Sequence, residues 1–146
     1  MKGFARGGAE SPEEEVMFQD ENGPIEEFTW GRFVICGEEH GKAGGKKTGK
    51  GKDIRLIGTK VSKWKEREGH LLSPSMITGV FDQGLDILII GIGVDGGIEC
   101  PEKVRRLIME RGIGQVVLKR TPEACGLYNR LFREGKRVAL LAHGTC

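Results

Sequence analysis

The chain has 146 residues, of which 38% are apolar and 30% are charged, which is typical of one compact globular domain and disfavours a wholly disordered chain. The net charge of +2 at pH 7 is too close to neutral to imply a nucleic-acid partner. No apolar stretch reaches the roughly 20 residues needed to cross a bilayer, and Met1–Glu10 lacks the apolar region of a secretory signal. We therefore expect a soluble cytoplasmic protein with no membrane insertion.

Acidic residues are concentrated at the start of the chain. Residues 1–27 hold two basic and eight acidic side chains, a net charge of −6. A segment of this kind, with few large apolar groups, cannot bury enough surface to offset the entropy lost on ordering. We predict a flexible acidic tail over residues 1–24 and a single α/β domain over residues 25–146.

The first half of the domain has the pattern of a small β-unit. Residues 25–30 and 32–36 alternate apolar and polar side chains, so we predict two antiparallel strands of a β-meander joined near Gly31. Glycine and lysine then interleave over residues 37–52, which predicts a solvated basic loop. A further strand is expected over residues 53–57. The lysines of the loop form a basic partner surface: Lys42, Lys46, Lys47, Lys50 and Lys52.

The second half alternates helix and strand signals. Ser73-Pro74 and Gly84 predict the ends of a helix, Pro101 and Gly112 those of a second, and Thr121-Pro122 and Gly135 those of a third. Apolar runs predict buried strands over residues 86–90, 115–118 and 137–142. This order predicts a three-layer α/β fold with a mixed, mostly parallel central sheet, helices, and the antiparallel meander at its N-terminal side.

Polar side chains follow several of these strands. If strands 53–57, 86–90 and 137–142 run parallel, then residues 59–72, 91–100 and 143–146 meet at one edge of the sheet, where α/β proteins bind ligands. The candidates for acid–base or nucleophilic work there are Glu68, His70, His143 and Cys146. The alternative is that Trp64 covers the core and the polar groups bond loop backbone.

Three short motifs fall short of known cofactor sites. Gly91-x-Gly93-x-x-Gly96 follows a buried strand, but further residues intervene before Pro101, unlike the dinucleotide fingerprint. The pattern of a phosphate-binding loop fails at Gly51, where serine or threonine is required. Cys36, Cys100, Cys125 and Cys146 form no close pair, and His143-x-x-Cys146 supplies two metal ligands where a closed zinc site needs four. We expect reduced thiols, no cofactor and no metal.

An ordered set of short motifs resembles a known family. The set comprises Trp30-Gly31, Trp64 with Glu68-Gly69-His70, Leu88-Ile89-Ile90-Gly91-x-Gly93, Thr121-x-Glu123-Ala124 with Tyr128-Asn129, and His143-x-Thr145-Cys146. Together they resemble the adipogenesis-associated Mth-type domain family, small uncharacterised proteins whose relatives include a mitochondrial assembly factor for respiratory complex I. The resemblance covers about residues 25–146 and implies an α/β fold with an added β-meander. The pocket positions that it implies are Trp64, Glu68, His70, Gly91, Gly93, Asn129, His143 and Cys146.

Three functions remain open at this point. We favour a binding or assembly-adaptor protein, with an unidentified protein partner or a small anionic ligand, over an enzyme. The enzyme alternative acts on a small anionic molecule. In it, Cys146 or His143 is nucleophile or base, Glu68 and His70 orient the proton transfer, and backbone N–H groups near Gly91 and Gly93 hold the anion. Weak nucleic-acid binding through the basic loop is the third option.

Overall fold

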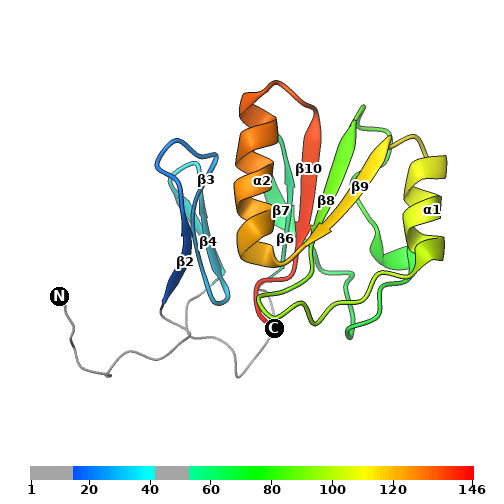
Figure 1. The fold of residues 1–146 in the computed structure, drawn as a ribbon, viewed down its shortest axis with the longest axis horizontal. Coiled ribbons are helices and arrows are strands. Elements are labelled where there is room, and N and C mark those ends of the chain that lie inside the picture. Colours follow the sequence, from blue (N-terminus) through cyan, green and yellow to red (C-terminus); the bar gives the residue numbers. More distant parts are fainter. Residues whose placement is uncertain (1–14, 42–52) are drawn as a thin grey trace.

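The computed structural model describes residues 15–41 and 53–146. It contains two β-sheets and two α-helices (Figure 1). None of the helices in these two ranges has the length and apolar character needed to span a bilayer. The five lysines of the predicted basic loop lie outside the described residues. The described part of that loop contains strand β5 (Glu38–Gly41), which the sequence did not predict.

The central sheet has five strands in the order β7-β6-β10-β8-β9. Strands β8 (Ile87–Gly91), β9 (Gln115–Lys119) and β10 (Val138–Ala142) run parallel, and every residue of β8 and β10 is buried, as expected for strands covered on both faces. Strand β6 (Ile54–Ile57) pairs antiparallel with β10, and β7 (Lys60–Lys63) pairs antiparallel with β6. The mixed α/β fold predicted from the sequence is confirmed.

Two helices occupy opposite faces of this sheet. Helix α2 (Thr121–Arg133) packs between the central sheet and the N-terminal sheet, whereas α1 (Glu102–Glu110) lies beside β9 on the other face (Figure 1). Helix α1 buries Val104 and Ile108, one turn apart, in a core that also contains Trp64. Tyr128 of α2 is fully buried in the second core, which joins the two sheets.

The N-terminal sheet is an antiparallel meander of four strands, two more than predicted. Its order is β2 (Val16–Gln19), β3 (Ile25–Thr29), β4 (Arg32–Ile35) and β5. The prediction of a flexible tail is therefore wrong over residues 16–24. Asp20, next to β2, accepts hydrogen bonds from Asn129 and Arg133 of α2, which ties this segment to the domain. The acidic composition of the whole segment hid a short apolar stretch, because Met17 and Phe18 of β2 pack against the core that contains Tyr128.

Two further predictions were wrong in ways that matter for the site. The α-helix predicted between Ser73 and Gly84 does not form, and this segment contains only a short 3-10 helix, Pro74–Met76. The helix ends there because Ile77 is extended, and Gly79 then takes a positive φ of 74°. Strand β6 pairs antiparallel with β10 rather than parallel, with Ile54 opposite Ala142, and Gly58 and Thr59 then turn the chain into β7. With the predicted direction, β6 would have led the chain toward Trp64 at the edge of the sheet where β8, β9 and β10 end. In the structure β6 runs away from that edge, and the unpredicted strand β7 returns the chain to it.

Candidate functional site

The site lies at the carboxyl edge, which we define as the edge of the central sheet where β8, β9 and β10 end. Ala142, the last residue of β10, pairs with Ile54, the first of β6, and Ile54 pairs with Lys63, the last of β7. Asp53 and Trp64 therefore lie at the same edge as the 143–146 segment. The N-terminal sheet reaches this edge too, because the Gly31 N–H donates to the Gly144 carbonyl at 2.7 Å.

The backbone of the 143–146 segment is held from several sides. The His143 N–H donates to the Gly91 carbonyl at 2.9 Å, and the Thr121 hydroxyl donates to the His143 carbonyl at 2.7 Å. The carbonyl of Thr145 accepts from Val94, and the carbonyl of Cys146 accepts from the N–H groups of Asp95 and Gly97. These contacts fix the direction in which the side chains of the segment point.

Three side chains of the predicted site come together around a sulfur atom. Cys146 Sγ lies 3.6 Å from His70 Nε2 and 3.7 Å from His143 Nε2. His143 is buried, His70 is exposed, and Cys146 is partly exposed. The sulfur is thus flanked by a buried imidazole on one side and an imidazole open to solvent on the other.

Asp53, which was not among the predicted site residues, contacts His143 at the ring nitrogen that faces away from Cys146. Its Oδ1 lies 2.8 Å from His143 Nδ1 and accepts the Gly144 N–H at 3.2 Å, while its Oδ2 accepts from the Arg67 guanidinium. Burial alone raises the pKa of Asp53, but its hydrogen bonds and charge interactions with His143 and Arg67 outweigh burial, so the pKa lies below its ordinary value.

The state of Asp53 sets the tautomer of His143. An ionised carboxylate can only accept hydrogen bonds, so Nδ1 of the neutral imidazole must carry the proton that Asp53 accepts. Nε2 then presents a lone pair to its other neighbours, which are Cys146 Sγ and Thr145 Oγ1, the latter at 3.2 Å. Only 5% of Thr145 is exposed. The accessible group facing this lone pair is therefore the thiol.

Four other predicted positions have structural roles. The Trp64 indole is buried and donates to the Met76 carbonyl at 2.8 Å. Asn129 bonds both the N–H and the carbonyl of Ile25, which uses its amide to join α2 to the N-terminal sheet. A Cβ on Gly91 would lie 3.1 Å from Thr121 Oγ1, and one on Gly93 would lie 2.4 Å from the Cys146 carbonyl carbon. Gly93 therefore makes room for the 143–146 segment, and Gly91 for Thr121 and Ala142.

The predicted anion cradle near Gly91 and Gly93 is also wrong, because its donors are occupied. The Gly93 N–H donates to Thr121 Oγ1 at 3.0 Å, and the N–H groups that follow bond carbonyls within the chain. Glu68 is exposed, and its carboxylate makes no hydrogen bond to another described residue. The acid that orients the imidazole is Asp53 instead.

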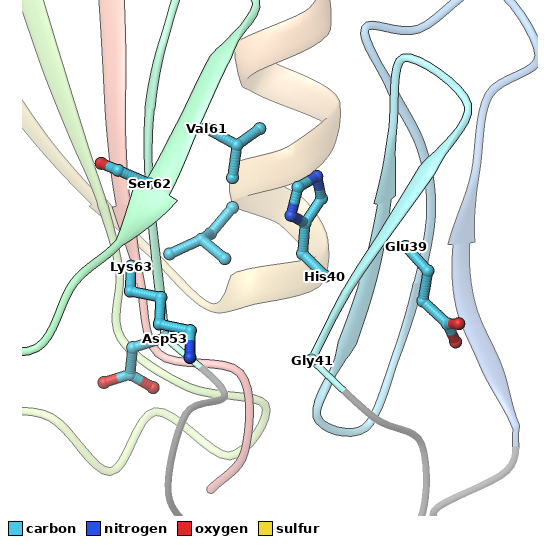
Figure 2. A pocket seen from close by; sticks show the side chains of 8 residues that line it. Glu39, His40, Gly41, Asp53, Val61, Ser62 and Lys63 are labelled. Carbon is cyan, nitrogen blue, oxygen red and sulfur yellow. The ribbon is translucent and has the colours of Figure 1, made fainter.

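A cavity of about 290 Å³ opens beside Asp53, between the two sheets. Figure 2 shows that His40 of β5 and Val61 of β7 point into this gap, whereas Glu39 points away from it. Nε2 of His40 is buried and has no hydrogen-bond partner among the described residues. The cavity is lined by Glu39, His40, Gly41, Asp53, Ile54, Val61, Ser62 and Lys63, so it meets the site only at Asp53.

The four cysteines are all free thiols. Full burial raises the pKa of the Cys125 thiol, and burial also raises that of Cys100. Within residues 15–41 and 53–146, no group of three or more His, Cys, Asp or Glu side chains is arranged to hold a metal ion. Cys146 is the cysteine whose sulfur contacts imidazole nitrogens.

The fold and site describe a small mixed α/β protein with a thiol at the carboxyl edge of its sheet. Residues 25–143 match the family described as protein of unknown function DUF498/DUF598, and the chain belongs to this family. His143 is the last matched residue, so Cys146 lies just beyond the matched range.

Solved structures share this fold at low sequence identity. A conserved hypothetical protein, PH1505, from Pyrococcus horikoshii OT3 is 23% identical with a TM-score of 0.67, covering 84% of this chain and 98% of the other. An outer membrane protein from Bartonella henselae is 21% identical with a TM-score of 0.66, covering 90% and 100%. XCC1710 of Xanthomonas campestris is 17% identical with a TM-score of 0.59, covering 96% and 92%. At these identities the likeness concerns the fold alone.

Proposed function

We propose that this protein is an enzyme whose nucleophile is the Cys146 thiol. The observation that supports the proposal is the chain of contacts from Asp53 through His143 to Cys146. In such a chain the carboxylate holds the imidazole in one tautomer, and the imidazole takes the proton of the nucleophile. His143 is then the base, and Asp53 orients it. The interactions of Asp53 with His143 and Arg67 keep its pKa low and the carboxylate ionised, and Arg67 also helps to hold it in place.

The thiol is a better nucleophile here than the neighbouring hydroxyl. Thr145 Oγ1 is nearer to His143 Nε2, but it is buried and its side chain has no open path to a substrate. Cys146 is partly exposed, and the thiolate is intrinsically the stronger nucleophile. A cytoplasmic location suits this chemistry, because thiols remain reduced there.

The assembly-adaptor function and the link to the adipogenesis-associated Mth-type family remain predictions. An adaptor needs a docking surface, and the large exposed apolar side chains among the described residues, Val16, Leu71 and Met109, come from three separate parts of the chain. Nucleic-acid binding would depend on the lysines of residues 42–52, which lie outside the described residues; retention on heparin that is lost with salt would reveal it.

The proposal is tested by the rate at which iodoacetamide modifies Cys146 in the full chain at pH 7. Peptide mapping by mass spectrometry follows Cys146 and the exposed Cys36 in the same sample, so that Cys36 serves as the internal control. We expect Cys146 to react faster than Cys36, and His143→Gln to slow Cys146 at least about tenfold without changing Cys36. Equal rates for the two cysteines, with Cys146 unaffected by His143→Gln, would contradict the proposal.

A further inference from the structure

The surroundings of the Cys146 sulfur restrict the bond that it can attack. A thiolate that attacks a carbonyl carbon produces an oxyanion, which needs hydrogen-bond donors about 2.7–3.1 Å away. Residues 92–98, which we call the glycine turn, lie beside Cys146, and their backbone N–H groups already donate hydrogen bonds within the chain. These N–H groups bond the Lys119, Gly93, Thr145, Cys146 and Ile92 carbonyls and the Thr121 hydroxyl. Residues 92–98 therefore offer no free backbone N–H group to an oxyanion formed at Cys146.

A disulfide substrate, whose leaving group is a thiolate, needs no hydrogen-bond donors for an oxyanion. When a thiolate attacks a disulfide, no oxyanion forms, and the leaving group is a second thiolate that a nearby acid can protonate. His70 meets that requirement, since its Nε2 lies 3.6 Å from Cys146 Sγ and its ring is open to solvent, from which it can regain a proton. The two imidazoles that flank the sulfur therefore have different roles. His143 accepts the proton of the Cys146 thiol, and His70 donates a proton to the leaving thiolate.

The other cysteines are poorly suited to resolve a mixed disulfide within the chain. Cys125 is fully buried in α2, and burial raises the pKa of the Cys100 thiol, which disfavours the thiolate that resolution needs. Cys36 lies in the turn after β4, whereas Gly31, at the opposite end of that strand, contacts the 143–146 segment. A four-residue strand spans roughly 13 Å, which exceeds the reach of a disulfide.

We propose, building on the function above, that the substrate of Cys146 is the S–S bond of a small disulfide. The Cys146 thiolate attacks one sulfur of RS–SR, the S–S bond breaks, and a mixed disulfide Cys146–S–SR forms. The released RS⁻ takes a proton from the His70 imidazolium. A second small thiol, R′SH, gives its proton to the now neutral His70 imidazole and attacks the bound RS sulfur, which yields R′S–SR and restores the Cys146 thiolate and the His70 imidazolium. The net reaction exchanges one thiol for another, with no net oxidation of the protein.

The probes are bis(2-hydroxyethyl) disulfide for exchange, p-nitrophenyl acetate for acyl transfer and iodoacetamide for simple alkylation. Mass spectrometry of the intact chain and its peptides reports each adduct on Cys146. We expect a mixed disulfide on Cys146 that is released by 2-mercaptoethanol and is absent in Cys146→Ser. His70→Gln should slow disulfide attack at least about tenfold but leave alkylation within about twofold, because iodide departs without a proton. His40→Gln, which removes an imidazole that does not contact the sulfur, should change neither rate.

The outcomes separate this inference from the proposed function. Rapid alkylation and acylation of Cys146 without a mixed disulfide would overturn the disulfide substrate and leave the nucleophilic thiol intact. Equal slowing of alkylation and disulfide attack by His70→Gln would overturn the proton-donor role of His70. Alkylation of Cys146 no faster than that of Cys36, and insensitive to His143→Gln, would overturn both proposals.

Discussion

Replacing Asp53 with asparagine tests the core of the proposed site, because the side chain keeps its shape and loses its charge. Asp53 is 7% exposed and faces both the Arg67 guanidinium and the His143 imidazole. The amide can still accept one hydrogen bond, but Arg67 is left without its carboxylate. We expect Asp53→Asn to fold and to be clearly less stable than the wild type.

The size of the loss follows from the interactions removed. Hydrogen bonds to a charged group contribute about 1.5–3 kcal/mol each, and breaking one side of a buried ion pair costs about 3–5 kcal/mol. Because asparagine retains an acceptor, we expect the free energy of unfolding at pH 7 to fall by about 3 kcal/mol, a large part of the total for a domain of this size. Urea unfolding followed by circular dichroism measures this difference.

The pH dependence of that difference has a defined sign. The pKa of Asp53 in the folded protein lies below its ordinary value of 3.8, so its contribution is fully present well above pH 3.8 and is lost as the pH falls through the folded value. The difference in stability between the wild type and Asp53→Asn should therefore be constant near pH 7 and smaller at pH 3. Other carboxylates with lowered pKa values are common to both proteins and cancel in the comparison.

A matched control separates the buried carboxylate from an exposed one. Asp86 pairs with Arg137 at the surface, and Asp86→Asn should change stability far less than Asp53→Asn, because solvent and salt screen an exposed pair. A difference for Asp53→Asn below about 0.5 kcal/mol at pH 7, or one that does not change between pH 7 and pH 3, would refute the reasoning.

Three further outcomes follow from the packing. Gly97→Ala should slow alkylation of Cys146, because its Cβ would lie 2.9 Å from the Cys146 carbonyl oxygen. Gly114→Ala is the control, since its Cβ would lie 3.5 Å from the nearest atom and should leave the rate unchanged. Equal alkylation rates in the two variants would contradict the role of the glycine turn. Asn129→Ala should lower the free energy of unfolding by about 3 kcal/mol, measured with urea, and leave Cys146 alkylation unchanged; a selective loss of alkylation would return Asn129 to the site. Cys125 should resist iodoacetamide in buffer and react in urea, since its thiol is fully buried; modification of the folded chain would contradict that burial.

The parallel strands and helices α1 and α2 could be predicted from the sequence, because their signals are local. Unbroken apolar runs mark β8 and β10, and Pro101 and Pro122 stand at the beginnings of the helices. The hairpin of β6 and β7 was missed, since β7 has lysines at both ends and reads as an exposed segment. Its polarity depends on pairing with β10, which the local pattern does not encode.

The candidate site was predicted in part for a similar reason. His70, His143 and Cys146 are chemically distinctive, and they lie together although the assumed direction of residues 53–57 was wrong. Asp53 and Arg67 gave no comparable signal, because single charged residues near a strand usually face solvent. The one available hint was that Asp53 directly precedes a strand with alternating buried residues. The glycine pattern was misread as a ligand cradle, when it makes room for the chain itself.

The tautomer of His143 tests the central claim most directly. A two-dimensional ¹H–¹⁵N spectrum of the full chain, recorded at a pH where the imidazole is neutral, distinguishes a protonated Nδ1 from a protonated Nε2. We predict a single tautomer with the proton on Nδ1, facing Asp53, and a change toward the mixture of tautomers of a free imidazole in Asp53→Asn. A proton on Nε2 in the wild type, or a spectrum unchanged by Asp53→Asn, would contradict the account.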